Sequence, residues 1–93
     1  YTLNWLVPNS QKNEMEPLHI VLNPLCATDE DVPHEGEEFG YVLKGEVVLK
    51  LGKRKVKVKK GESFYYKADK VHCIINRNEK PAEFLWISTP PSF

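Results

Sequence analysis

The sequence predicts an all-β domain, a small antiparallel sandwich or barrel. Short runs of valine, isoleucine, leucine and aromatic residues alternate with polar residues at a period of two, which is typical of strands with one buried face. Glycine, proline and asparagine separate these runs at short spacing, as turns do. No segment shows a helical apolar period of any length. Many short strands with regular turn signals indicate an antiparallel two-layered fold.

Composition excludes several classes of protein. The 93 residues are 41% hydrophobic, which suits one compact domain and is too apolar for a disordered tail. Thirteen basic and thirteen acidic residues cancel, which gives no support for direct nucleic-acid binding. No apolar run approaches the ~20 residues of a membrane span, and no signal-peptide pattern opens the chain. Cys26 and Cys73 form no paired motif, so we expect free thiols, no membrane association and a cytoplasmic location.

The N-terminal third is expected to contribute two strands. Residues 1–7 alternate loosely and are ended by Pro8, which predicts an edge strand that packs on the barrel or on a partner. Residues 18–22 alternate more regularly. Within them, His19 is predicted to be a surface or interface side chain. Residues 28–31, of which the last three are acidic, are predicted to form a loop before the candidate site.

The rest of the chain predicts six further short strands, at 39–43, 46–51, 55–59, 63–66, 72–76 and 83–88. The third of these alternates lysine with valine inside a basic run from Lys50 to Lys60. Lysine on an exposed strand discourages edge-to-edge pairing between molecules. We therefore interpret the basic run as a solvated strand face rather than as a DNA-binding patch.

One stretch stands out as a candidate site. In an extended chain, His34, Glu38 and Val42 point to the same side, and Gly36 and Gly40 on that side leave room beside the polar pair. An imidazole and a carboxylate four residues apart can converge on a metal ion or a cationic ligand. The alternative for this stretch taken alone is an exposed acidic turn that leads into an ordinary hairpin.

These residues resemble the first motif of the cupin family, which ends in histidine, three or four residues, glutamate, six residues and glycine. His34, Glu38 and Gly45 match that spacing. In a second stretch, His72 and Asn76 lie on the same face of a predicted strand. The two stretches occur in the order that the family requires, and the resemblance runs from about residue 18 to the end.

The second cupin motif is matched with departures. Gly61, His72 and Asn76 keep its spacing, whereas Lys67 and Asp69 stand where proline and glycine are usual. The resemblance implies a small antiparallel jelly-roll barrel, also called a double-stranded β-helix. The run from 34 to 45 and the tail from 85 to 93 are similar to one branch in particular, the C-terminal sensor domain of lambda-repressor-like helix-turn-helix regulators, including the putrescine-utilisation type.

That branch implies a function and partners. Residues 1–93 would be a single sensor domain excised from a longer regulator, because the chain starts at Tyr1 without an initiator methionine. It would bind a small-molecule effector, pair as a homodimer, and meet DNA only through a helix-turn-helix domain that is not part of this sequence. No enzymatic activity and no catalytic residue are expected.

The metal site of fully equipped cupins has three histidines and one glutamate. Carried over by position, the resemblance gives His34, Glu38 and His72 as ligands, and the remaining histidine is replaced by Val32. The set is incomplete, so no cofactor is certain and a divalent transition metal is one alternative. Two histidines and a carboxylate still match the facial triad of non-haem iron sites. The runner-up function is accordingly a metal-dependent cupin enzyme, a dioxygenase, isomerase or decarboxylase.

An organic effector is the preferred alternative. A carboxylate at Glu38 inside an apolar barrel is costly to ionise unless it is paired, and an amine would offset that cost through charge-assisted hydrogen bonds. Tyr65 and Asn76 would add orienting contacts if they face inward, which completes the ligand-binding set of His34, Glu38, Tyr65, His72 and Asn76. A third interpretation is a hydrogen-bonded cluster that only supports the barrel.

The opposite strand face predicts self-association. Phe39, Tyr41 and Leu43 point away from the pocket. Either the terminal strand with Leu3 and Trp5 folds over this set or another subunit covers it, since monomers seldom expose so large an apolar patch.

Overall fold

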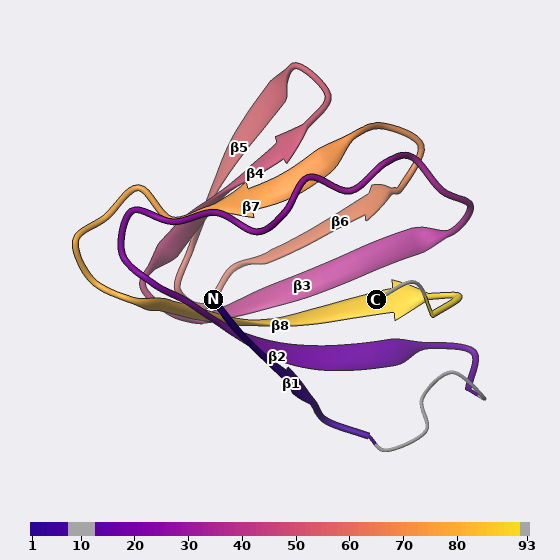
Figure 1. Cartoon of the computed structure of the whole chain (residues 1–93), viewed down its shortest axis with the longest axis horizontal. Coiled ribbons are helices and arrows are strands. Elements are labelled where there is room, and N and C mark those ends of the chain that lie inside the picture. Colours follow the sequence, from indigo (N-terminus) through magenta and orange to yellow (C-terminus); the bar gives the residue numbers. More distant parts are fainter. Residues whose placement is uncertain (8–12, 92–93) are drawn as a thin grey trace.

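The computed structural model describes residues 1–7 and 13–91 as two antiparallel sheets that face each other (Figure 1). Pro8, the predicted end of the first strand, and the last two residues of the cupin-like tail lie outside the described residues. The described residues form strands, turns and bends and no helix. None of them therefore belongs to a helix that is long and apolar enough to cross a membrane. The all-β prediction is confirmed.

Eight strands occur in the described chain: β1 (Thr2–Trp5), β2 (Glu16–Leu22), β3 (Glu37–Lys44), β4 (Glu46–Leu51), β5 (Arg54–Lys59), β6 (Ser63–Lys67), β7 (His72–Ile75) and β8 (Ala82–Thr89). One sheet has the order β1-β2-β8-β3-β6 and the other the order β5-β4-β7. All of their neighbours pair antiparallel. The strand that lies centrally in the larger sheet, β8, is the last along the sequence.

The period-two pattern explains which residues form the core. Along β2 and β8, every second side chain is buried, and the buried ones include Leu18, Ile20, Phe84 and Trp86. Apolar side chains on the inner faces of both sheets form one continuous core. Burial of each large apolar side chain stabilises the fold by about 1.5–3 kcal/mol. The alternation along the two strands therefore fixes which face of the larger sheet meets the smaller one.

The barrel is not closed along one side. β6 is the outer strand of the larger sheet and β5 the outer strand of the smaller sheet. Figure 1 shows the β4–β5 hairpin diverging from β6. The edge position of β5 agrees with the interpretation of its lysines as charges on an exposed edge strand, and five of its six residues are exposed.

The terminal strand joins a sheet edge, as predicted, but it does not cover the outer apolar residues. β1 pairs with β2 so that Leu3 lies opposite Ile20, and Leu3 packs against the core. The suggestion that this strand folds over Phe39, Tyr41 and Leu43 is wrong. Main-chain pairing with β2 satisfies the donors and acceptors of β1 that face it, and the three outer residues stay exposed.

The predicted acidic loop is partly an extension of the smaller sheet. Main-chain hydrogen bonds join Asn76 N to Cys26 O (2.8 Å) and Thr28 N to Ile74 O (2.9 Å). Asp31 and His72 exchange two main-chain bonds, of 2.8 and 3.1 Å. This segment thus runs beside β7 and brings the residues just before β3 close to the second histidine.

Candidate functional site

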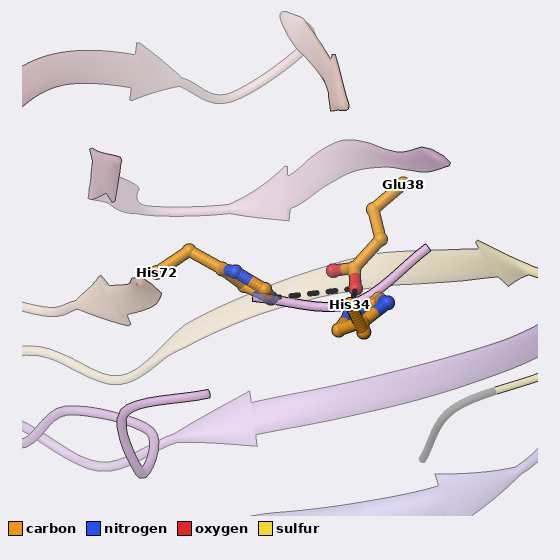
Figure 2. A group of neighbouring side chains, drawn as sticks. All are labelled: His34, Glu38 and His72. Atoms are coloured by element: carbon orange, nitrogen blue, oxygen red, sulfur yellow. Dashed lines mark hydrogen bonds and ion pairs between the residues drawn. The ribbon is translucent and has the colours of Figure 1, made fainter. Parts of the chain in front are cut away.

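Three of the predicted site residues, His34, Glu38 and His72, converge where β3 and β7 begin. Figure 2 shows Glu38 reaching from β3 toward the rings of His72 and His34. His34 Nε2 lies 2.9 Å and His72 Nε2 3.4 Å from Glu38 Oε2. One ligand atom from each residue lies within 4.8 Å of the others. The shared strand face of His34 and Glu38, together with the spacing of the two cupin-like motifs, predicted this convergence, and the structure contains it.

Local pairing explains the positions of the two histidines. His34 precedes β3, and its main-chain N–H donates to Ala68 O (2.8 Å), while Ala68 N–H donates to Gly36 O (3.0 Å). His72 opens β7 and is fully buried, opposite Asp31. Main-chain hydrogen bonds therefore hold both rings where the end of the larger sheet meets the smaller sheet.

The hydrogen bonds at Nδ1 fix the tautomers. His34 Nδ1 lies 3.1 Å from Glu35 O and His72 Nδ1 lies 2.9 Å from Lys70 O. A carbonyl oxygen only accepts, so both Nδ1 atoms carry hydrogen and both Nε2 atoms face Glu38. Neutral rings would then direct lone pairs at a carboxylate oxygen. The arrangement therefore requires a proton or a metal ion between the two Nε2 atoms and Glu38 Oε2.

The other oxygen of Glu38 is held by two donors that the sequence did not identify. Oε1 accepts the hydroxyl hydrogen of Tyr66 (2.5 Å) and the indole N–H of Trp86 (2.7 Å). All three side chains are buried. Because an indole N–H can only donate, this oxygen must act as an acceptor, which favours the carboxylate form.

The electrostatics of the cluster follow from these contacts. Burial acts to raise the pKa of Glu38, but the close approach of His72, the hydrogen bond from Tyr66 and the nearby positive charge hold the pKa below its ordinary value. Burial acts to lower the pKa of His72, yet the Glu38 carboxylate and the Lys70 carbonyl raise the pKa above its ordinary value. Burial and the neighbouring Glu38 charge raise the pKa of Tyr66. The cluster thus favours an ionised Glu38 and a neutral Tyr66.

Tyr65 does not reach the cluster. Its side chain is 59% exposed, and its hydroxyl donates to Glu37 on the outside of the sheet. The expectation that Tyr65 faces inward is wrong, because neighbouring residues on a strand point to opposite sides and Tyr66 takes the inner one. The sequence does not give the register of β3 with β6, which places Tyr66 directly opposite Glu38.

Asn76 is buried but is occupied elsewhere. Its amide nitrogen lies within hydrogen-bond distance of three carbonyl oxygens, those of Leu22, Asn23 and Lys80, and its Oδ1 accepts from Asn78 N–H (2.9 Å). It follows the end of β7, whereas His72 begins that strand. The amide therefore joins the loops that flank β7, β2 and β8, and any contact with an effector stays a prediction.

The position of the missing histidine is exposed. Val32 is 73% exposed. Its neighbour Asp31, which the sequence did not single out as a ligand, lies with Oδ2 3.5 Å from His72 Nε2. Burial raises the pKa of Asp31, and the nearby His72 lowers it by a smaller amount.

The space beside Gly40 is filled. A Cβ atom built on Gly40 would lie 2.0 Å from the ring of Phe64, so this glycine admits an aromatic side chain rather than a ligand. A cleft of about 310 Å³ opens instead between β5 and β6. Its apolar lining comes from β4, β5 and β6, and Tyr66 contributes both to this lining and to the hydrogen bond with Glu38. The tyrosine thus links the cleft to the polar cluster.

The cluster fits a divalent transition metal in its donor chemistry. Two imidazole nitrogens and a carboxylate form a ligand set that iron, zinc and nickel accept. His72 Nε2 is buried and makes no hydrogen bond with any described residue. Both rings are oriented by carbonyl groups at Nδ1, which is the usual outer support of metal-bound histidines.

Comparison with known proteins agrees with the fold. A profile of the Cupin domain family matches residues 18–88. The HTH-type transcriptional regulator PuuR of Escherichia coli (strain K12) is 28% identical over 89 residues, which are 95% of this chain and 48% of that protein. The chain thus spans about half the length of the curated relatives that it matches.

Two solved structures share the fold. The cupin domain of an XRE family transcriptional regulator from Enterobacter cloacae superposes with a TM-score of 0.85 at 22% identity, over 98% of this chain and 97% of that one. An HTH_3 family transcriptional regulator from Vibrio cholerae superposes with a TM-score of 0.83 at 22% identity, over 97% of this chain and 51% of that one.

Proposed function

The chain belongs to the cupin family, and from that premise we propose that it is the small-molecule-sensing domain of a helix-turn-helix transcriptional regulator. Regulators occur among both the sequence relatives and the structural neighbours. In this proposal residues 1–93 form one sensor domain in the cytoplasm. DNA is bound by a separate helix-turn-helix domain.

The buried carboxylate of Glu38 carries the proposal. Its side chain is fully buried, yet one of its oxygens faces two imidazoles, and the half-buried His34 links the cluster to solvent. The nearby cleft of about 310 Å³ is at the lower end of the volumes that hold small organic ligands, about 300–1,000 Å³. We place the effector between the sheets, in contact with the Tyr66 ring and in electrostatic reach of Glu38.

A cationic amine is the effector class that the charges favour. Tyr66 and Trp86 occupy Oε1 of Glu38, and His34 Nε2 is the group nearest to Oε2. An ammonium group that displaced His34 would supply the positive charge that the carboxylate needs, through a charge-assisted hydrogen bond. Displacement of this half-buried ring is the change by which occupancy would alter the protein surface.

The test is a thermal-unfolding screen of the purified domain with short linear monoamines and diamines, and with carboxylates of matched length. We expect amines to raise Tm for the wild type and for Glu37→Gln, which removes a charge on the outer side of β3, but not for Glu38→Gln. Equal stabilisation of Glu38→Gln would refute the amine site. Absence of stabilisation by every compound class tested would refute effector sensing.

The regulator proposal includes a homodimer formed through the outer face of the larger sheet. Phe39, Tyr41 and Leu43 on β3 and Tyr65 on β6 are exposed there, next to the partly exposed Ile87. A two-fold axis uses one such face twice, so a single apolar patch is sufficient. We therefore propose a second copy of this chain as the partner.

A metal-dependent cupin enzyme is the second candidate, because His72 Nε2 is buried without a hydrogen-bond partner among the described residues. His34, Glu38 and His72 would hold the ion, which would supply Lewis-acid or redox chemistry for a dioxygenase, isomerase or decarboxylase reaction. Elemental analysis of domain purified without chelators separates the candidates. One equivalent of iron, zinc, manganese or nickel favours the enzyme, and a metal-free domain favours the sensor.

A further inference from the structure

Of the basic residues in β5, all of which the structure describes, Arg54 alone projects to the inner side of the smaller sheet. It follows the same alternation as Val56 and Val58, and Val58 is buried in the core. The lysines of this strand occupy the positions between these three residues and therefore project outward. The interpretation of the basic run as a solvated strand face thus accounts for the lysines but not for Arg54.

Strand register places Arg54 at the end of the barrel that holds the polar cluster. Arg54 pairs with Leu51 on β4, and Leu51 pairs with His72 on β7. Directly opposite residues of neighbouring strands project to the same side of a sheet. Neighbouring strands lie about 4.8 Å apart, so the main chains of Arg54 and His72 are about 10 Å apart. The three side chains thus form one row across the inner face of the smaller sheet.

The cleft between β5 and β6 reaches both Arg54 and the hydrogen-bond network of Glu38. Its volume is about 310 Å³, and its lining includes Arg54, Leu51 and Tyr66. The hydroxyl of Tyr66 donates to Glu38 Oε1. The β4–β5 hairpin, which carries Arg54, diverges from β6 on this side of the molecule (Figure 1). A molecule in the cleft would therefore meet a guanidinium at one end and approach a buried carboxylate at the other.

The charge of Arg54 is not neutralised within the described part of the chain. Two other charged residues line the cleft, Lys57 and Glu62. Lys57 Nζ lies 4.0 Å from Glu46 Oε1, and Glu62 Oε1 accepts the main-chain N–H of Lys59 (2.8 Å). No carboxylate of a described residue lies within 4.0 Å of the Arg54 guanidinium. The cleft thus contains a cation whose partner the described residues do not supply.

We propose that Arg54 binds a carboxylate group of the effector, which is therefore a zwitterion with its ammonium group at Glu38 and its carboxylate at Arg54. The inference rests on the proposed sensor function and specifies the chemical class of its effector. A guanidinium holds a carboxylate through two parallel hydrogen bonds, and one such fork balances one negative charge. A linear ω-amino acid matches this pair of charges. A diamine is disfavoured, because its second ammonium group would meet Arg54.

The test is isothermal titration calorimetry of the domain with linear ω-amino acids of increasing length, each compared with the unbranched alkylamine and the diamine of the same length. We expect the wild type to bind the best ω-amino acid at least about tenfold more tightly than the matched alkylamine, because the bidentate pair adds to the binding free energy. The matched diamine should bind more weakly than the alkylamine.

Substitutions on β5 assign the preference to one side chain. Arg54→Gln should lose the preference for ω-amino acids and keep the wild-type affinity for alkylamines. Arg54→Lys keeps the charge but not the fork, so it should retain only part of the preference. Lys55→Gln removes a positive charge from the next residue, which projects outward and does not line the cleft, and should bind every compound as the wild type does.

Three results would overturn the proposal. The first is a wild type that binds ω-amino acids no more tightly than alkylamines, and the second is an Arg54→Gln variant that keeps the full preference. The third needs no variant: an Arg54 Nε–H resonance that does not shift when the wild type is saturated with the ω-amino acid. In each case alkylamine binding that depends on Glu38 would leave the sensor proposal standing. Binding of no compound at all would refute the sensor proposal together with this inference.

Discussion

The indole N–H of Trp86 donates to Glu38 Oε1 over 2.7 Å, and both side chains are buried in the core. A tryptophan on β8 and a glutamate on β3 are thereby joined across two neighbouring strands. The indole has no second protonation state, so it fixes the carboxylate as an acceptor at every accessible pH. Glu38 is for this reason part of the fold as well as of the site.

Removal of the Glu38 side chain should therefore destabilise the domain strongly. In Glu38→Ala, the buried Tyr66 hydroxyl and Trp86 N–H lose their acceptor, and we expect a loss of about 3 kcal/mol in the free energy of unfolding. Glu38→Gln keeps an acceptor oxygen and should lose less than half of that. Urea denaturation measures both, and equal losses for the two variants would contradict the assigned roles.

The two neighbouring tyrosines should respond differently to loss of the hydroxyl group. Tyr66→Phe removes a buried hydrogen bond to a charged group, for which we expect a loss of about 2 kcal/mol in unfolding free energy. Tyr65→Phe removes an exposed contact with Glu37 and should change stability little. The two substitutions remove the same hydroxyl group, one on the outer and one on the inner face of β6. A larger loss of stability for Tyr65→Phe than for Tyr66→Phe would contradict this assignment of the two faces.

The stability of the metal-free domain should pass through a maximum in mildly acidic solution. The lowered pKa of Glu38 contributes stability that is present above its ordinary value of 4.5 and lost as the pH falls through the lower folded value. The raised pKa of His72 contributes stability that is complete below its ordinary value of 6.5 and lost as the pH rises through the higher folded value. The maximum is expected between about pH 4.5 and 6.5.

Denaturation across pH tests this expectation, and the carboxyl group of Asp31, whose pKa is raised by burial, also lies beside His72. His72→Gln should remove much of the decline above pH 6.5. His19→Gln, which changes a histidine paired with Glu83 on the outer face, should retain it. A decline that persists unchanged in His72→Gln would assign it to another group.

Gly40 should tolerate no side chain unless Phe64 becomes smaller. An added Cβ would lie 2.0 Å from the Phe64 ring, and overpacking of this kind costs about 1–3 kcal/mol. We expect Gly40→Ala to be destabilised by that amount and Gly40→Ala/Phe64→Leu to lose less than the sum of its two single variants. Double-mutant analysis of unfolding free energies measures the coupling, and strict additivity would exclude the proposed contact.

Charge on the outer face should dissociate the proposed dimer. We expect the wild type to sediment as a dimer at micromolar concentration and Tyr41→Glu as a monomer, because a buried unpaired carboxylate opposes association. Val71→Glu adds the same charge at another exposed position and should remain dimeric. A wild type that sediments as a monomer at every concentration would refute the interface.

Much of the fold was predictable. Period-two alternation placed Glu38 and Val42 on one face of the strand, and that face of β3 is the buried one. Inner and outer positions within a strand follow from sequence, but the partner across the sheet does not. Tyr66 and Trp86 meet Glu38 through register with β6 and β8, which only long-range pairing sets. Asp31 was missed for the same reason, since its pairing with His72 joins segments that the sequence separates by a strand-rich region.

The order of strands also sets the order in which the domain can be assembled during synthesis. Within the larger sheet, the described strands β2 and β3 are joined by hydrogen bonds only through β8, which pairs with each of them at seven positions. Until residues 82–89 have left the ribosome, β1 and β2 have no hydrogen-bonded route to the remainder of that sheet. A chain that stops before Ala82 would thus lose the middle of the sheet rather than its margin, and the N-terminal hairpin would be left as an isolated pair, which is marginally stable in water.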